Sequence, residues 1–313
     1  MQIAVVVPCH NEEASIPHFV ERMAAVEHDL APWLSEPVSY VLVDDGSTDG
    51  TLSCMRELHT RDQHWHYVSF SRNFGKEAGL LAGMRKALEL GSTHVAVMDA
   101  DLQDPPELLV QMCERIDGSE FDAVAAYRKT REGEPPIRSW FAHRFYNFMN
   151  KVSETTMRDG ARDFRLMTRR MVEEICALPE VGRFSKGLFM WVGFKTDWLG
   201  YDNIEREYGT TSWNFQGLVR YAIDGILAFS IWPLEAISII GVVLSALALL
   251  FLLFIFMRAL FFGDPVAGWP SMICIVTLLG GVQILGIGTI GLYLSKIYSE
   301  VKRRPNYIVS EQA

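Results

Sequence analysis

Short apolar runs alternate with longer amphipathic segments along the first part of the chain. The apolar runs lack polar alternation, as expected for strands buried on both faces, and occupy residues 3–8, 40–43, 67–70, 94–98 and 123–126. The segments between them carry apolar residues at helical spacing and occupy residues 12–30, 49–61, 76–90 and 106–116. Strands that alternate with helices predict an α/β fold with a mostly parallel sheet.

The C-terminal part of the chain has a different pattern. No charged residue occurs over residues 236–257 or over residues 265–295. A hydrocarbon core about 30 Å thick needs roughly 20 helical residues, so we expect two transmembrane helices, at about 234–258 and 268–294. Before them, residues 213–232 repeat apolar positions at helical spacing, with only Arg220 and Asp224 charged. This pattern predicts an amphipathic helix at the membrane surface, with a core helix of the first domain as the alternative.

Charge is divided in the same way. The chain has a net charge of −9, but residues 1–230 hold 24 basic and 34 acidic residues, whereas residues 231–313 hold 5 and 4. The acidic N-terminal part argues against nucleic acid as a partner, and its hydrophobicity argues against disorder. We therefore divide the chain into a cytoplasmic domain at 1–210, an interfacial helix at 211–232, and a membrane part with a basic tail at 233–313.

Flanking basic residues predict the orientation of the two spans. Lys296, Lys302, Arg303 and Arg304 follow the second span, whereas the connector between the spans has only one basic residue. The positive-inside rule places the C-terminus in the cytoplasm, and two spans return the N-terminal domain to the same side. The N-terminus has no signal-peptide pattern, which agrees with this topology. We expect a multi-pass protein of the inner (plasma) membrane, and the glycines of its second span are typical of close helix packing or of a homo-oligomer interface.

Three polar clusters follow the first, second and fourth predicted strands, at residues 8–12, 44–50 and 99–106. Ligands of parallel sheets bind at the carboxyl ends of the strands, so these clusters are expected to meet at one edge. Neither a glycine-rich dinucleotide fingerprint nor a phosphate-binding Gly-Lys-Ser/Thr loop is present. The sequence therefore disfavours a dehydrogenase and a P-loop NTPase.

Asp99 and Asp101 form the most informative pair. Residues i and i+2 of an extended segment point the same way, and two carboxylates so placed favour Mg²⁺ or Mn²⁺. Mg²⁺ typically takes one or two carboxylates and completes its coordination with substrate phosphates, which predicts a metal-bound nucleotide diphosphate. A solvated acidic turn is the alternative, and the two companion clusters argue against it.

Together these motifs resemble those of family 2 glycosyltransferases. The resemblance is carried by the Pro-x-His-Asn-Glu segment at 8–12, Val-Asp-Asp-Gly-Ser-Thr-Asp-Gly-Thr at 43–51 and Met-Asp-Ala-Asp-Leu-Gln-Asp-Pro-Pro at 98–106. It extends to Asn-Phe-Gly-Lys-Glu at 73–77, Arg-x-x-Arg-Glu-Gly-Glu at 128–134 and Asp-Phe-Arg-Leu-Met at 163–167. With two spans and a basic tail, the whole chain resembles the polyprenyl-phosphate glycosyltransferases, such as bactoprenol glucosyltransferases and dolichyl-phosphate mannose synthases. The resemblance implies a GT-A-type, Rossmann-like nucleotide-sugar-binding domain.

The resemblance also implies roles for particular residues. The base and ribose would be bound by Pro8, His10, Glu12, Val43 and Asp45. In the Asp-Ala-Asp segment, Asp99, Ala100 and Asp101 would hold ribose, metal and diphosphate, with Asp101 favoured as the direct metal ligand. Gln103 would lie near the sugar, Arg128 and Arg131 near phosphates of donor or acceptor, and Arg206 at the diphosphate. Where the family has a lysine this sequence has Ser212, and Lys186 or Lys195 are candidates to replace it.

The implied reaction is inverting transfer of a sugar to a polyprenyl phosphate. Asp163 is the candidate general base by analogy, and the alternative is an ion pair with Arg162, Arg165 or Arg169. Arg138 lies on a stretch that interleaves bases with aromatic residues and would meet the acceptor phosphate and the lipid surface; a plain, partly exposed helix is the alternative.

The sugar is the main open choice. Glucose from UDP-glucose is our first expectation, because the 128–134 and 163–167 segments look bactoprenol-type, as in lipopolysaccharide modification. Mannose, N-acetylglucosamine, galactose and aminoarabinose stay open. A processive synthase is disfavoured because no Gln-x-x-Arg-Trp motif is present, and a non-catalytic membrane scaffold is disfavoured because Asp45, Asp99 and Asp101 are all retained. The family resemblance implies a tetramer.

Overall fold

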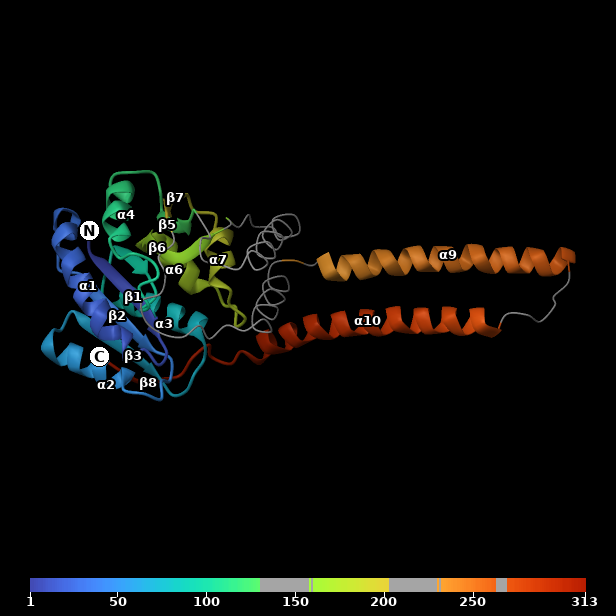
Figure 1. The fold of residues 1–313 in the computed structure, drawn as a ribbon, viewed down its shortest axis with the longest axis horizontal. Coiled ribbons are helices and arrows are strands. Elements are labelled where there is room, and N and C mark those ends of the chain that lie inside the picture. The colour runs from blue at the N-terminus through green and yellow to red at the C-terminus, as the bar shows by residue number, and fades with distance from the viewer. Residues whose placement is uncertain (130–157, 159, 203–229, 231, 263–268) are drawn as a thin grey trace. The chain divides into compact units, whose positions relative to one another are not determined.

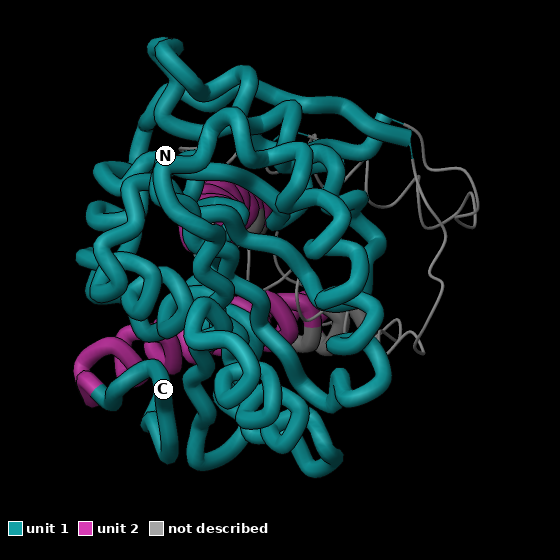
Figure 2. Tube along the Cα trace, turned by 90° about the vertical axis from the view of Figure 1, so that its left-hand side faces the viewer, with its two compact units in different colours: residues 1–228, 304–313 teal, residues 229–303 magenta. Residues whose placement is uncertain are grey.

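The structure is a computed structural model that describes residues 1–129, 158, 160–202, 230, 232–262 and 269–313. The chain divides into two compact units (Figure 2). The first combines residues 1–228 with residues 304–313, and the second comprises residues 229–303.

The first unit is built around an eight-stranded mixed sheet (Figure 1). Its strands are β1 (Ile3–Cys9), β2 (Ser39–Asp44), β3 (Trp65–Phe70), β4 (His94–Val97), β5 (Ala123–Arg128), β6 (Ala161–Thr168), β7 (Thr196–Tyr201) and β8 (Val309–Gln312). They lie in the order β7-β5-β6-β4-β1-β2-β3-β8. The strands from β4 to β3 are mutually parallel, whereas β6 is antiparallel to both of its neighbours. The predicted α/β class with a mostly parallel sheet is confirmed.

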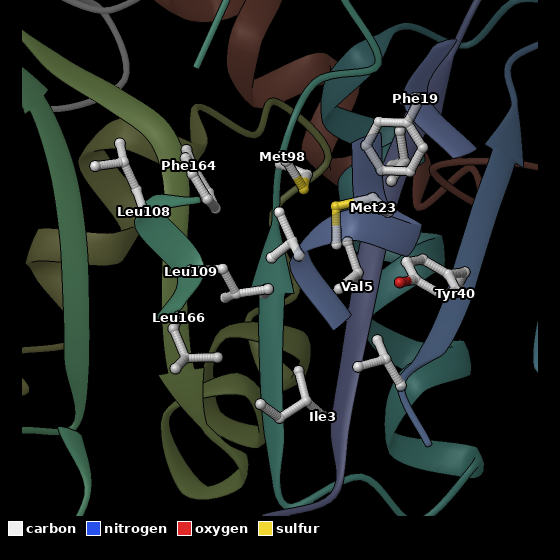
Figure 3. Close-up of a cluster of buried hydrophobic side chains, with 14 of the residues drawn as sticks. Ile3, Val5, Phe19, Met23, Tyr40, Met98, Leu108, Leu109, Phe164 and Leu166 are labelled. Carbon is white, nitrogen blue, oxygen red and sulfur yellow. The ribbon is translucent and has the colours of Figure 1, made fainter. Parts of the chain in front are cut away.

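Helices cover both faces of the sheet. They are α1 (Ser15–Leu30), α2 (Thr51–Arg61), α3 (Lys76–Glu89), α4 (Leu108–Ile116), α6 (Arg169–Ala177) and α7 (Ser185–Trp191), with a short 3-10 helix at Ala31–Trp33. One buried cluster joins α1, α2 and α4 to the sheet, and its members include Val5, Phe19, Met23 and Leu109 (Figure 3). A second cluster joins α3, α6 and α7 to the opposite face. Both faces are therefore buried, which explains why the parallel strands are uniformly apolar.

The antiparallel strand β6 was not indicated by the hydrophobic pattern. It carries Arg162, Asp163 and Arg165 among its first residues, so it does not form an apolar run. Strand β7 and helices α6 and α7 follow it and were also not predicted. Helices α1 and α4 begin two to three residues later than predicted, because the polar residues that precede them belong to the loops at the strand ends.

The last residues of the chain return to the sheet. The sequence assigned residues 304–313 to a tail of the membrane part, but β8 pairs with β3 in an antiparallel manner and belongs to the first unit. Tyr307 stacks on Phe70 with ring centroids 5.0 Å apart, and Arg56 Nε donates to Glu311 Oε1 at 2.9 Å. The strand thereby covers an edge of β3 that would otherwise expose unpaired backbone groups.

The second unit contains two long apolar helices, α9 (Trp232–Phe262) and α10 (Trp269–Lys302). At 1.5 Å per residue, 31 and 34 residues extend about 46 and 51 Å, more than the hydrocarbon core of a bilayer. Large apolar side chains on both helices are exposed, among them Val242, Leu249 and Ile287. Both helices contain segments long and apolar enough to cross a membrane, at Trp232–Phe251 and Leu278–Lys302.

The predicted interfacial helix at 211–232 lies outside the described residues, apart from Ser230 and Trp232. Within the second unit, α9 contacts α10, and a Cβ added at Gly286 would meet Ile237 at 3.4 Å. A Cβ added at Gly280, Gly281, Gly288 or Gly291 would meet nothing within 4 Å, so the expected close packing is seen at Gly286 and not at the other four glycines.

Candidate active site

The carboxyl ends of the parallel strands meet at one edge of the sheet, which we call the carboxyl edge. It receives the polar clusters that follow β1, β2 and β4, as predicted. Strand β6 reaches the same edge from the opposite direction, with Val97 paired to Arg165. Asp99 lies two residues after Val97, and Asp163 lies two residues before Arg165. Strand pairing thus brings together two acids that are far apart in the sequence.

The acids after β2 are closed off by hydrogen bonds. Asp44 and Asp45 are only 2% and 4% exposed. Asp45 accepts hydrogen bonds from the backbone N–H groups of Phe74 at 2.6 Å and Gly75 at 2.9 Å. Asp44 accepts from Ser47 N at 2.9 Å and Ser69 Oγ at 2.7 Å. Burial raises the pKa of Asp45, and the two N–H donors oppose this shift. The pair therefore holds the β2–α2 turn against the β3–α3 loop.

Gly46 shows how closely these loops approach. Its φ of 64° lies in the left-handed region, and a Cβ there would be 2.3 Å from the carbonyl carbon of Arg72. Both the backbone conformation and the space require glycine at this position.

The segment after β1 packs on the same turn. The Nδ1 atom of His10 is 3.0 Å from the carbonyl oxygen of Asp45, and Glu12 N donates to Thr51 Oγ1 at 2.9 Å. His10 is exposed and Pro8 is half-buried, so both are accessible for the predicted nucleotide contact. Val43 is fully buried in the core, and its predicted contact with the base stays a prediction.

The acids after β4 are arranged differently. Asp99 Oδ1 lies 2.6 Å from Lys76 Nζ, and the same ammonium lies 2.7 Å from Asp163 Oδ2. The side chains of Lys76, Asp99 and Asp163 are 43%, 22% and 16% exposed. Asp101 Oδ1 accepts from Gln103 N at 3.2 Å, and Ala100 between the two acids is buried. A lysine side chain therefore holds Asp99, whereas Asp101 is bound by backbone.

Asp163 forms an ion pair, but with a cation that the sequence did not suggest. Its partner is Lys76, whereas Arg162 pairs with Asp104 and Arg169 with Glu173. Burial raises the pKa of the Asp163 carboxyl, but the charges of Lys76 and Lys186 outweigh it and hold this pKa well below its usual range. The proposed base is thus an ionised carboxylate with a strongly reduced affinity for a proton.

Arg165 binds the backbone at Asp163. Its fully buried guanidinium donates from Nε to the carbonyl oxygen of Asp163 at 3.2 Å and from Nη2 to that of Arg162 at 2.9 Å. The guanidinium carbon also lies 3.8 Å from the ring centroid of Phe189 on α7. Burial lowers the pKa of Arg165 to about 10. These contacts fix the backbone that carries Asp163.

A second network surrounds Gln103. Its Oε1 accepts from Arg128 Nη2 at 3.2 Å and from Arg162 Nη2 at 3.4 Å. The buried Asp104 accepts from Arg162 Nε at 2.8 Å and also from the hydroxyl of Tyr201. Burial and the neighbouring Asp104 raise the pKa of Tyr201 to about 12. Arg128 and Gln103, both predicted site residues, are therefore bonded to each other directly, and Arg162, Asp104 and Tyr201, which were not predicted as site residues, extend the network.

The sequence contained a signal for some of the missed residues. Lys76 stands in the Asn-Phe-Gly-Lys-Glu segment that carried part of the resemblance, and Arg162 directly precedes Asp163. Asp104 belongs to the cluster after β4. Tyr201 had no such signal, because β7 itself was not recognised.

A divalent cation fits Asp99 and Asp101. No group of three or more His, Cys, Asp or Glu side chains suited to a metal occurs in the described parts of the chain. Two carboxylates at an open strand end match a magnesium-like ion that takes its other ligands from phosphates and water.

The remaining positions that the sequence proposed for phosphate contacts fall into three cases. Arg131, Arg138, Arg206 and Ser212 lie outside the described residues. Lys195 precedes β7 at the opposite edge of the sheet and pairs with Glu120 at 2.5 Å. The charge of Lys186 on α7 helps to lower the pKa of Asp163. Of the two lysines suggested to replace the family lysine, only Lys186 lies near the carboxyl edge.

Comparison with known proteins identifies the family of this chain. Residues 4–176 match the family described as Glycosyl transferase family 2. The SfII prophage-derived bactoprenol glucosyl transferase of Shigella flexneri is 38% identical over 311 residues, 99% of this chain and 98% of the relative. The uncharacterized glycosyltransferase sll0501 of Synechocystis sp. is 37% identical over 311 residues, 99% of this chain and 95% of the relative. The putative glycosyltransferase CsbB of Bacillus subtilis is 37% identical over 309 residues, 99% of this chain and 91% of the relative. The chain therefore belongs to glycosyl transferase family 2, and it is a glycosyltransferase with a GT-A-type α/β domain.

Proposed function

We propose that this enzyme transfers a hexose, glucose from UDP-glucose in the first instance, to a polyprenyl phosphate at the cytoplasmic face of the inner membrane. Whole-chain similarity to a protein named bactoprenol glucosyl transferase supports the acceptor and the sugar. The observation that carries the proposal is the joint presence of an Asp99–Asp101 site at the carboxyl edge and two long apolar helices. A polyprenyl chain stays in the bilayer, so its transferase needs both.

In this reaction a phosphate oxygen of the acceptor forms a bond to the anomeric carbon as the bond to the donor diphosphate breaks. Inversion follows from direct displacement, and the nucleoside diphosphate leaves. Asp99 and Asp101 would hold Mg²⁺ or Mn²⁺, which when bound stabilises the negative charge on the leaving diphosphate. Pro8, His10, Glu12, Val43 and Asp45 would bind the nucleotide.

Gln103 would face the sugar, with its carbonyl oxygen oriented by Arg128 and Arg162. Arg128 and Arg206 would contact donor phosphates, and Arg131 and Arg138 the acceptor phosphate. Assembly as a tetramer is proposed from the family resemblance alone.

For Asp163 we propose that its negative charge, and not the abstraction of a proton, contributes to catalysis. Efficient bases have a pKa near the working pH, whereas the pKa of Asp163 is held well below its usual range. The acceptor phosphate has a second pKa of about 6 and is largely ionised near neutrality, so it needs little help as a nucleophile. The Asp163→Asn variant should lose turnover yet keep the shape of its pH–rate profile. A change in that shape would restore the base assignment.

Lipid labelling tests the proposed function. Full-length enzyme in detergent is incubated with MgCl₂ or MnCl₂, polyprenyl phosphate and one labelled nucleotide sugar from a panel. We expect label from UDP-glucose in the organic-extractable lipid, and none with Asp101→Ala. Label from a different sugar would correct the donor. Absence of label with every sugar would contradict the proposed transfer and favour the scaffold alternative.

A further inference from the structure

The Lys76 ammonium occupies a position between two functional carboxylates. Lys76 is the first residue of α3, and it follows Gly75, whose φ of 96° turns the chain into the helix. Its Nζ atom lies within 2.7 Å of both Asp99 and Asp163, which come from neighbouring strands. The lysine therefore links the predicted donor carboxylates to the residue predicted for the acceptor side.

This arrangement leaves one Asp99 oxygen already paired with a cation. An ammonium and a divalent cation repel each other strongly at contact distance, so both cannot share that oxygen at little cost. A displaced ammonium needs another anion nearby. Asp163 stays paired with the ammonium, and a phosphate that arrives with the donor replaces Asp99 as its second partner.

The lysine is partly exposed, in contrast to the acids after β2. Its side chain is 43% exposed, and a lysine can change partners through its side-chain rotamers while the backbone stays in place. A lysine ammonium is a compact charge on a flexible four-carbon stem, so it can exchange one anionic partner for another.

We propose that Lys76 is a resident cation of the donor site, which neutralises Asp99 and Asp163 in the ligand-free enzyme and makes tight binding of a divalent cation depend on a nucleoside diphosphate. This inference rests on the proposed function, because that function assigns Asp99 to the metal. Lys76 acts as a positioning residue: it keeps the two carboxylates together until donor and cation arrive as one complex. The ammonium then becomes a partner for a phosphate.

Binding of Mn²⁺ to the full-length enzyme, followed by electron paramagnetic resonance, tests the inference without acceptor or sugar. MnCl₂ is titrated alone and then in the presence of UDP. With MnCl₂ alone, the Lys76→Met variant should bind Mn²⁺ more tightly than wild type, by up to about fivefold, the upper end of the range expected from losing one partly exposed ion pair. By linkage, the gain in Mn²⁺ affinity caused by UDP should shrink in the variant.

Two variants serve as controls. Lys76→Arg keeps the charge and should bind Mn²⁺ as wild type does. Lys86→Met removes an ammonium from the last turn of the same helix and should also leave Mn²⁺ binding unchanged. A general effect of losing a lysine from α3 would appear in both methionine variants.

Several results would overturn the inference. Equal or weaker Mn²⁺ affinity of folded Lys76→Met without UDP contradicts it, and so does wild-type enzyme whose Mn²⁺ affinity is the same with and without UDP. The second measurement needs no variant and applies even if Lys76→Met fails to fold. Absence of Mn²⁺ binding to wild type in the presence of UDP would instead contradict the metal in the proposed function. Failure of lipid labelling alone would leave the role of Lys76 standing.

Discussion

Two acidic clusters follow strands that flank β1 on either side, and they look alike in the sequence. One contains Asp44 and Asp45 after β2, and the other contains Asp99 and Asp101 after β4. In the structure, the backbone N–H groups of Phe74 and Gly75 bind Asp45, whereas the side chain of Lys76 binds Asp99. The first cluster is almost fully buried and the second remains partly open.

The difference separates carboxylates that support a loop from carboxylates that can exchange binding partners. A carboxylate that accepts from backbone N–H groups can change partners only if a loop moves. A carboxylate that is paired with an ammonium on a flexible stem can change partners while the backbone stays in place. We infer that the cluster after β2 shapes the β3–α3 loop beside the proposed nucleotide site, and that the cluster after β4 is the one that exchanges partners when ligands bind.

The largest expected effect comes from Asp101→Asn. Loss of one carboxylate from the cation site should reduce turnover by about 10²–10³-fold, as removal of one charge-stabilising group does in other active sites. Thermal stability should stay close to wild type, because Asp101 lies in the open cluster. Parallel lipid-labelling and thermal-melting measurements check this. Turnover within an order of magnitude of wild type would remove Asp101 from the metal site.

Asp45→Asn should behave in the opposite way. An amide can accept from only one of the two N–H groups that the carboxylate binds, and its NH₂ group faces the other. We expect a loss of about 1–3 kcal/mol in the free energy of unfolding, measured by thermal or urea denaturation. Asp101→Asn is the matched control. A melting curve like that of wild type would show that Asp45 does not support the loop.

Glu77 on α3 should make the stability of the protein depend on pH. It accepts a hydrogen bond from Ser185 N at 2.8 Å and neighbours Lys76. Burial raises its pKa from 4.5 to about 7, and the Ser185 hydrogen bonds oppose this shift. The folded state therefore binds this proton more tightly than the unfolded chain, so the contribution to stability is complete below pH 4.5 and is lost as pH rises through 7.

Compared with Glu77→Gln, wild type should gain about 2–3 kcal/mol of stability as pH falls from neutral toward 4.5. Denaturation of both proteins across this range measures the difference. Parallel stability curves would show that the Glu77 proton makes no contribution to stability.

The smallest effect is expected for Glu311→Gln on β8. Glu311 is bound by Arg56 and by the hydroxyl of Tyr67, which lie away from both clusters. Exposed ion pairs contribute little, so we expect a slight loss of thermal stability that disappears at high salt, and unchanged lipid labelling. A large loss of activity would show that the edge strand takes part in shaping the site.

The hydrophobic pattern predicted five of the eight strands, and the motifs predicted both acidic clusters. Strands β6 and β7 were missed because their charged and polar residues interrupt the apolar pattern. Strand β8 was missed because residues after a basic stretch at the end of a span are typical of a free tail. The ion pair of Lys76 with Asp163 depends on β6, so it was missed together with that strand.

The sequence by itself determined the α/β class, the carboxyl edge as the site, the two apolar helices and the family. These features depend on burial and spacing along the chain, so they can be recognised directly from the order of residues. Only the tertiary structure decided that Asp45 binds backbone, that Asp99 shares Lys76 with Asp163, and that the last strand covers β3. Such pairings depend on strand order and register between distant segments, and a local pattern of residues does not encode which of two similar carboxylates meets which partner.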